Sequence, residues 1–263
     1  LEAKALKGRG MAMDRQFPRL VIRRDKLRNN FTQIVSRCRA CGINVAGVIK
    51  GVGGLPEIAR LYKECGAAQL ATSRLEQIEL WRREGVDGPF LLLRVPGMSE
   101  LESLPHLADY SLQSDVSTLN ALENVCARQN LTHKVILMAD LGDLREGFWD
   151  KAEMIRACCH VEWELPHLIL AGVGVNLGCY GSIAPPPANL GQLVDIARAV
   201  EEQIGRKLEI VSGGATSSYP LVHRGIMPAG INHLRIGEAA LLAKDLQVDW
   251  GIPDMDYLQP GSI

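Results

Sequence analysis

The stretch GVIKGVGG, residues 47–54, ends an apolar run with Lys50 and continues with glycines. Similar short runs rich in Val, Ile and Leu recur along the chain, separated by longer amphipathic segments. This alternation is typical of a parallel sheet whose strands are joined by helices. The stretch therefore places a lysine at the carboxyl end of a buried strand, where an ionised side chain is unusual.

The apolar runs predict eight strands, at residues 44–50, 69–72, 90–94, 110–113, 134–140, 168–175, 208–212 and 233–236. Helices are predicted at residues 26–39, 55–65, 75–84, 100–106, 116–129, 151–159, 190–204, 219–224 and 238–244. Thr72–Ser73 and Ser114–Asp115 stand where helix N-caps belong. The order of these units predicts an α/β protein with a (β/α)8 TIM barrel, and a doubly wound open sheet is the alternative.

The domain organisation follows from where these units lie. Residues 19–245 contain all of them and are predicted to form one barrel domain, close to the roughly 250 residues typical of this fold. Residues 1–18 are expected to be an N-terminal extension. The first residue is Leu1, and Met11 or Met13 could be the natural first residue, so part of this extension is a candidate for a non-native segment. Residues 246–263 are expected to be a linker that leaves the barrel.

The composition favours a small-molecule site over other kinds of partner. The 263 residues carry 29 Lys and Arg against 30 Asp and Glu, so we expect no nucleic-acid partner and no membrane partner. No stretch approaches the roughly 18 apolar residues of a membrane span, and no secretory core is evident, which predicts a cytoplasmic protein. Seven cysteines favour reduced thiols. Cys38 and Cys41 lack a second pair at zinc-finger spacing, so no metal is expected.

Polar residues gather where the predicted strands end. Lys50, Asp140, Asn176, Ser212 and Arg235 follow or close strands one, five, six, seven and eight. In a TIM barrel the carboxyl ends of the strands and the loops after them form the active-site face. We therefore expect these side chains to lie at one rim of the barrel.

Two consecutive loops on that rim have the composition of a phosphate site. Strand seven runs into SGGATSS, residues 212–218, and strand eight into RIGEA, residues 235–239. Glycines let the backbone approach an anion, and hydroxyl and N–H groups donate to it. Barrel phosphate sites are often built from these two loops, although a tight turn with a helix cap explains either loop alone. A lysine across the barrel from a phosphate site suggests pyridoxal 5′-phosphate, whose aldehyde forms a Schiff base with a lysine amine.

At these positions the sequence resembles the alanine racemase-like barrels, the fold-type-III pyridoxal-phosphate enzymes. The resemblance covers about residues 19–244 and includes Lys50 at the end of the first strand. The family signature Asp-x-Gly-x-x-Arg-x-Gly is present as DLGDLREG, residues 140–147. The sequence motifs are most similar to those of ornithine racemase-like members in NLGCYG, residues 176–181, in SGGATSS, and in GINHLRIGEA, residues 230–239.

Several features depart from the family pattern. The tyrosine that follows the Schiff-base lysine is missing after Lys50, Asn176 stands where a histidine is frequent, and apolar residues such as Met138 occupy the position that can carry a modified lysine. Two-domain racemases continue into a β-rich domain that supplies a second catalytic base. The chain ends at Ile263, so we expect that domain to be absent or only begun.

The resemblance implies a role for each site residue. It makes Lys50 and Arg145 catalytic, with Arg145 near the cofactor's phenolic oxygen and the substrate carboxylate. It places Lys50, Asn176, Thr216, Ser217, Arg235, Gly237 and Glu238 around the cofactor, with Arg235 facing the pyridine nitrogen. The alternatives are a solvated loop charge for Arg145, a salt bridge at the rim for Arg235 and a turn cap for Asn176.

The implied function is a pyridoxal-phosphate-dependent amino-acid racemase. It would interconvert L- and D-amino acids by moving the Cα proton through the Lys50 Schiff base, acting as a homodimer. The alternatives are a single-domain pyridoxal-phosphate carrier without turnover and a fold-type-III decarboxylase.

The residues beside Arg145 suggest a substrate class. Asp143 and Glu146 flank it in the loop after strand five. If Arg145 takes the substrate carboxylate, one or both acids are available for a distal ammonium group. A cationic amino acid such as ornithine is therefore expected to be favoured over alanine.

Overall fold

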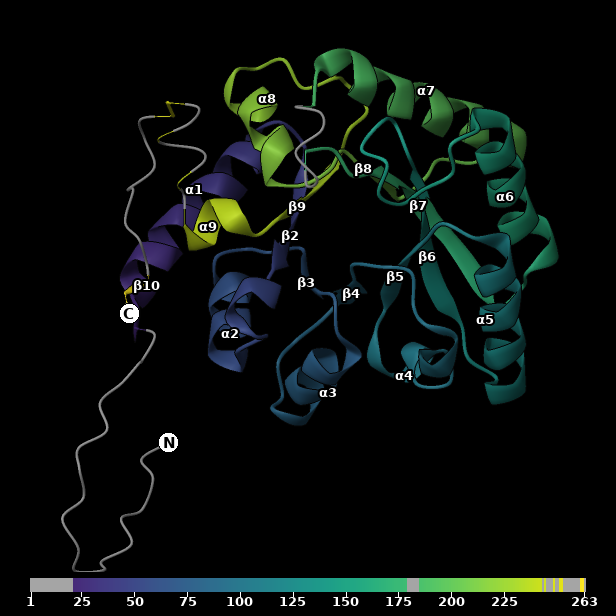
Figure 1. Cartoon of the computed structure of the whole chain (residues 1–263), viewed down its shortest axis with the longest axis horizontal. Helices are drawn as coiled ribbons and strands as arrows, with labels where there is room; N and C mark the ends of the chain where they lie inside the picture. The colour runs from purple at the N-terminus through teal and green to yellow at the C-terminus, as the bar shows by residue number, and fades with distance from the viewer. Residues whose placement is uncertain are drawn as a thin grey trace, which may run out of the picture.

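Eight parallel strands close on themselves into a barrel, in the order β2 to β9, in the part of the chain that the structure describes. The computed structural model describes residues 21–178 and 185–242, together with residues 244, 248, 251, 252, 261 and 262. Helices surround the strands in chain order (Figure 1). The predicted TIM barrel is confirmed, and the open sheet is excluded because β9 pairs with β2.

The strand bounds lie close to the predicted ones. They are β2 (Asn44–Val48), β3 (Gln69–Thr72), β4 (Phe90–Leu92), β5 (Tyr110–Gln113), β6 (His133–Ala139), β7 (Leu168–Val175), β8 (Ile210–Ser212) and β9 (His233–Ile236). β2 ends two residues before Lys50, because Ile49 leaves the extended conformation at φ −111° and ψ 1°. Lys50 therefore opens a single 3₁₀ turn, η1 (Lys50–Val52), at the rim.

The helices pack around the outside of the barrel. They are α1 (Arg24–Ala40), α2 (Pro56–Glu64), α3 (Leu75–Arg83), α4 (Leu104–Leu107), α5 (Val116–Gln129), α6 (Lys151–Glu164), α7 (Pro187–Ile204), α8 (Tyr219–His223) and α9 (Glu238–Leu241). Two further 3₁₀ turns are η2 (Met98–Glu100) and η3 (Thr216–Ser218). Of the helix predicted at 238–244, α9 covers Glu238–Leu241, Leu242 is in a turn, Lys244 is again helical, and residue 243 lies outside the described residues.

The prediction of one continuous helix at residues 100–106 was wrong. The segment contains η2 and the short α4 instead of one helix. Glu100 is held by a paired hydrogen bond to Arg94, with Nη1 of Arg94 2.6 Å from its Oε2, and it also accepts from the backbone N of Gly97 at 2.7 Å. These contacts within the loop fix a tight turn at the place where a continuous helix was expected.

One of the two predicted caps is confirmed. Asp115 caps α5, accepting a hydrogen bond from the backbone N of Thr118 at 2.7 Å. The prediction for Thr72–Ser73 was wrong, because Arg74 occupies the N-cap position of α3 and makes no side-chain cap. The Thr72 hydroxyl instead bonds the Gln77 side chain.

Two apolar layers hold the barrel together. Inside it, side chains from the strands form one cluster, Ala46, Val48, Ala71, Leu91, Leu93, Tyr110, Leu112, Ile136, Met138, Ala171 and Ile210. Outside it, a larger cluster joins strands to helices and includes the fully buried Trp81, Tyr62 and Phe31. Burial of apolar surface on both faces is what makes strands of this kind read as continuous hydrophobic runs.

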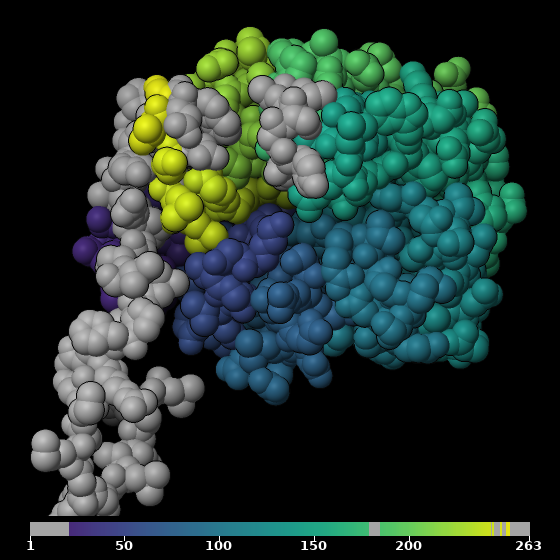
Figure 2. Space-filling model, in the orientation of Figure 1, coloured from purple at the N-terminus to yellow at the C-terminus, as the bar shows by residue number. Residues whose placement is uncertain are grey.

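The barrel depends on close approaches between elements that lie side by side. A Cβ added at Gly172 of β7 would lie 1.9 Å from the carbonyl oxygen of Ile210 in β8, so only glycine fits there. Asn30 of α1 donates to the carbonyl of Ala240 in α9 at 3.1 Å. Figure 2 shows α9, in yellow, beside the blue segments that follow β2.

The ends of the described chain also meet. β1 (Val21–Ile22) pairs antiparallel with β10 (Gly261–Ser262), a contact that the sequence did not predict. The predicted extension, residues 1–18, and most of the predicted linker, residues 246–263, lie outside the described residues. Among those described, no helix combines the length and apolar character needed to cross a membrane.

The barrel interior predicts a specific response to acid. His133, at the start of β6, is 2% exposed, with Nε2 2.9 Å from the Ser111 hydroxyl, and burial lowers its pKa to about 4. Its unfolded pKa is about 6.5. Between these values the unfolded chain binds a proton that the folded chain does not, so the free energy of unfolding falls as pH falls, by up to about 1.4 kcal/mol per pH unit.

We expect His133→Asn to remove this contribution. Urea unfolding at pH 7, 6 and 5 should show the stability gap between the unmodified protein and the variant narrowing as pH falls. His106→Gln, which changes an exposed ring, is the control and should leave the pH slope as it is. Parallel pH curves for the unmodified protein and His133→Asn would contradict the prediction.

Candidate active site

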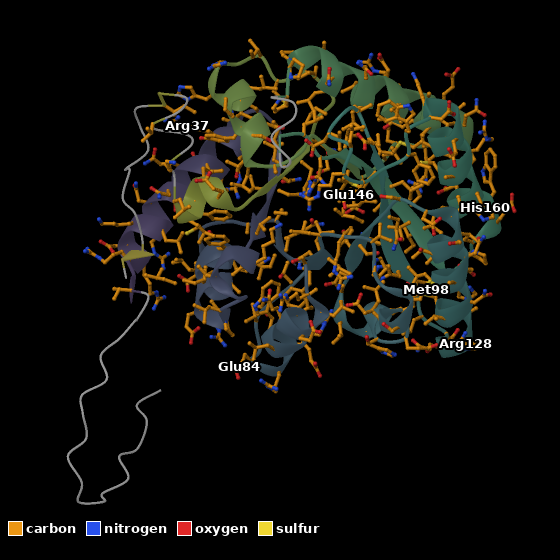
Figure 3. The ribbon with its side chains drawn as sticks, in the orientation of Figure 1. Arg37, Glu84, Met98, Arg128, Glu146 and His160 are labelled. Carbon is orange, nitrogen blue, oxygen red and sulfur yellow. The ribbon has the colours of Figure 1, made fainter. Side chains whose placement is uncertain are left out.

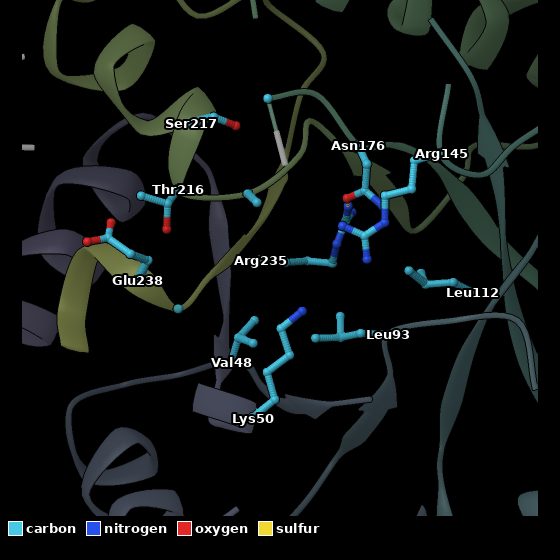
Figure 4. A pocket seen from close by; sticks show the side chains of 13 residues that line it. Val48, Lys50, Leu93, Leu112, Arg145, Asn176, Thr216, Ser217, Arg235 and Glu238 are labelled. Carbon is cyan, nitrogen blue, oxygen red and sulfur yellow. Dashed lines mark hydrogen bonds between the residues drawn. The ribbon is translucent and has the colours of Figure 1, made fainter. Parts of the chain in front are cut away.

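A cavity of about 280 Å³ opens where the strands end (Figure 4). It is lined by Val48, Lys50, Leu93, Leu112, Arg145, Asn176, Gly178, Ala215, Thr216, Ser217, Arg235, Gly237 and Glu238. All eight residues that the sequence singled out for the site are in this set. The barrel therefore brings them together from five separate segments of the chain, while the role of each remains a prediction.

Lys50 enters the cavity from the β2 side. Its backbone is fixed, because the preceding Ile49 is fully buried and donates to the carbonyl of Ala71 at 3.0 Å. Its side chain is exposed and points toward the cavity centre (Figure 4). Within the described residues Lys50 makes no side-chain hydrogen bond or ion pair, so its amine is available to a ligand.

Arg235 lies deep in the site, only 3% exposed. Its Nη1 donates to the Ser212 hydroxyl at 2.5 Å, and its Nη2 donates to the carbonyl of Val175 at 2.9 Å and to Oδ1 of Asn176 at 2.5 Å. These acceptors are neutral oxygens at the ends of β7 and β8. The guanidinium is thereby held in one orientation beside the cavity.

The two predicted phosphate loops are tied to each other and to the loop after β7. The Thr216 hydroxyl accepts from the backbone N of Ala239 at 3.2 Å, and the Ser217 hydroxyl donates to the carbonyl of Leu177 at 2.5 Å. A Cβ at Gly237 would lie 3.1 Å from Cβ of Val48, tighter than most such contacts. Gly237 therefore keeps the backbone of the last loop close to β2 and open toward the cavity.

Glu238 takes part in this wall through its backbone. Its carboxylate points away from the cavity centre in Figure 4, although the residue lines the cavity. A carboxylate directed at a bound phosphate would repel it. The orientation therefore suits a backbone contribution at the start of α9 better than a side-chain one.

The DLGDLREG loop is built around Asp140. Its Oδ1 accepts from the backbone N of Gly142 at 2.9 Å and of Leu144 at 3.1 Å, and Leu144 has a positive φ of 54°. A Cβ at Gly147 would lie 2.4 Å from the backbone N of Asp140, so the loop closes only with glycine there. This folding carries Arg145 to the cavity.

Arg145 is exposed at the cavity edge. Its side chain makes no hydrogen bond or ion pair with another described residue. A guanidinium presents paired donors that match a carboxylate. Arg145 is thus placed to bind an anionic group of a ligand.

The two acids beside Arg145 have separate surroundings. Asp143 is buried at 2% exposure, and its Oδ1 accepts from the backbone N of Gly178 at 3.0 Å. Glu146 is half-buried, and its Oε1 accepts from Nδ2 of Asn176. Asp143 therefore shapes the loop after β7, and Glu146 contacts the cavity wall from behind.

Sequence reasoning missed part of the wall. Val48, Leu93 and Leu112 form its apolar side, and Gly178 and Ala215 complete it. The apolar residues read as ordinary strand interior, and only their position near the strand ends could have identified them. No group of three or more His, Cys, Asp or Glu that could hold a metal ion occurs among the residues described.

Comparison with known proteins identifies relatives over most of the chain. The protein-family model named "Alanine racemase, N-terminal domain" matches residues 22–245. The lysine racemase of Thermotoga maritima is 36% identical over 241 residues, which cover 89% of this chain and 66% of that protein. The ornithine racemase of Acetoanaerobium sticklandii is 35% identical over 229 residues, 87% of this chain and 64% of that protein. The chain thus spans about two thirds of the length of these relatives.

Solved structures share the fold at lower identity. The D-threonine aldolase from Filomicrobium marinum aligns with a TM-score of 0.77 at 19% identity, covering 93% of this chain and 67% of that one. The alanine racemase of Clostridium difficile 630 in complex with cycloserine aligns with a TM-score of 0.70 at 18% identity, covering 84% and 60%. At such identities the likeness concerns the fold alone.

The link between the two loops is testable by a stability measurement. Replacing Thr216 by Val would leave the buried N–H of Ala239 without its acceptor, at a cost of about 1–3 kcal/mol in the free energy of unfolding. Thr216→Ser keeps the hydroxyl and should recover most of that loss. Urea unfolding of both variants decides the matter, and equal stabilities for the Val and Ser variants would show that the hydroxyl does not join the loops.

Proposed function

Since this chain belongs to the family of the alanine racemase N-terminal domain, we propose that it is the barrel of an amino-acid racemase that uses pyridoxal 5′-phosphate. The observation that carries the proposal is the convergence of Lys50, Arg235 and the two phosphate loops on one cavity. A homodimer and a cytoplasmic location stay predictions from the resemblance and the composition.

The residues present fit this cofactor. Hydroxyl and backbone donors of Thr216, Ser217 and Gly237 are suited to its phosphate, and a side chain at Gly237 would press against Val48 in the cavity wall. The amine of Lys50 is suited to its aldehyde. The donor groups of Arg235 are suited to its ring nitrogen, and a guanidinium cannot give up a proton to that nitrogen at ordinary pH.

The chain's own residues then divide the chemistry. When bound, the cofactor delocalises the electron pair left on Cα after the proton departs. Lys50 would accept a proton from Cα, or donate one to it, at its Nζ on the face of the substrate that it reaches. Inversion also needs an acid–base group on the opposite face, which the resemblance assigns to the β-rich domain of two-domain racemases. Arg145 binds the substrate carboxylate and orients Cα. Val48, Leu93 and Leu112 exclude water from one side of the reacting atoms.

A cationic substrate is the finer part of the proposal. Two relatives that match 89% and 87% of the chain are named for lysine and ornithine. Of the two acids considered for a distal ammonium group, Asp143 is buried against Gly178, which leaves Glu146. Its carboxylate contacts Asn176, which lines the cavity, from the side away from the cavity. We therefore assign the preference for a cation to Glu146.

Rates of racemisation by the full-length protein test both the racemase activity and the preference for a cationic substrate. L-Ornithine is compared with L-norvaline, which has the same carbon chain without the ammonium group, and each product is separated by chiral chromatography. A charge-assisted pair of roughly 1.5–3 kcal/mol predicts a preference of about ten- to hundredfold for ornithine. Glu146→Gln should reduce that preference, and Lys50→Ala should abolish turnover of both.

The cationic preference and the racemase activity can each be contradicted separately. Equal rates for ornithine and norvaline would remove the cationic preference and leave a racemase. Binding of the cofactor without turnover of any of ornithine, lysine, norvaline or alanine would favour the carrier without turnover and contradict the racemase.

A further inference from the structure

Asn176 joins two charged groups that come from different parts of the rim. Its Nδ2 donates to Oε1 of Glu146, and its Oδ1 accepts from Nη2 of Arg235 at 2.5 Å. Asn176 and Arg235 are 8% and 3% exposed, so water competes little for these bonds. In Figure 3 Glu146 lies near the middle of the molecule, whereas Glu84 and His160 lie toward its edge.

This arrangement permits only one orientation of the Asn176 amide. A carboxylate can only accept hydrogen bonds, and a guanidinium can only donate them. The amide therefore has to present its NH₂ to Glu146 and its oxygen to Arg235. The reverse orientation would place the oxygen against the carboxylate and the NH₂ against the guanidinium, and it would lose both bonds.

Glu146 thereby acts on Arg235 without touching it. Arg235 donates to the Ser212 hydroxyl and to the Val175 carbonyl. Its Nη2 also donates to the oxygen of Asn176, and Glu146 sets the direction in which that oxygen points. Glu146 is not among the residues that line the cavity, yet it follows Arg145 directly in the chain. The loop that carries one cavity arginine is therefore connected to the orientation of the other.

We propose that Glu146 is a positioning residue that fixes the guanidinium of Arg235 through the amide of Asn176. The role concerns the acceptor oxygen of Glu146, whereas the cationic preference proposed above concerns its charge. Glu146→Gln keeps an acceptor oxygen and removes the charge, and Glu146→Ala removes both. The two roles are thus separable with two variants, and only the cofactor measurement rests on the proposed function.

The first measurement uses the full-length protein without cofactor. The side-chain nitrogen signals of Arg235 are recorded by nuclear magnetic resonance and assigned by their loss in Arg235→Lys. Glu146→Ala should shift or broaden these signals, and Glu146→Gln should leave them near their original positions. Glu153→Ala, which removes an exposed carboxylate on α6, is the control and should change nothing.

The second measurement is the dissociation constant for pyridoxal phosphate and the pH dependence of its visible absorption once bound. We expect Glu146→Ala to weaken binding about tenfold and to move the pH profile, while Glu146→Gln stays within about threefold. Because Glu146 acts through Asn176, the double variant Glu146→Ala, Asn176→Ala should bind no more weakly than Asn176→Ala alone.

Two outcomes would overturn the proposal. Arg235 signals that are the same in Glu146→Ala and in the unmodified protein would show that Glu146 does not orient the guanidinium. Additive losses in the double variant would show that Glu146 acts independently of Asn176. Failure of the unmodified protein to bind pyridoxal phosphate would count against the proposed function, and the resonance measurement would still decide the role of Glu146.

Discussion

A buried guanidinium is the constraint on which the rest of the site depends. Arg235 lies almost entirely inside the barrel, and a cation in that position is tolerated only when its donors are satisfied. Its acceptors are the Ser212 hydroxyl, the Val175 carbonyl and the Asn176 amide, which belong to the ends of β8 and β7 and the loop after β7. Holding this one side chain therefore requires three adjacent strands to end at the same level, which barrel closure provides.

The packing around Arg235 leaves room for it. A Cβ added at Gly174 would lie 3.0 Å from Sδ of Met138, 3.2 Å from Cβ of Ser212 and 3.5 Å from Nη1 of Arg235. The apolar layer that includes Met138 and Ile210 fills the barrel interior. Arg235 thus lies where the apolar interior of the barrel gives way to the polar residues at the strand ends. Lys50 faces the same cavity from the end of β2 (Figure 4).

The sequence predicted the barrel because each strand is a local signal, a short apolar run between amphipathic segments. It grouped Lys50, Asn176 and Arg235 because the carboxyl ends of parallel strands share one edge. Arg145 and the residues of the two phosphate loops were added by the family resemblance and the loop composition, and all eight line one cavity. It missed what distant contacts decide. The β1–β10 pair joins segments far apart in the chain, and the different surroundings of Asp143 and Glu146 arise from contacts with Gly178 and Asn176. No local pattern carries such information.

Everything proposed for the site requires that Lys50 holds the cofactor. To test this, the full-length protein is mixed with one equivalent of pyridoxal phosphate and reduced with borohydride, and the fixed adduct is located by mass spectrometry of peptides. We expect one adduct on Lys50, and none at that position in Lys50→Ala, whose visible absorption band should also be missing. An adduct on another lysine with Lys50 unmodified, or an unchanged absorption band in Lys50→Ala, would contradict it.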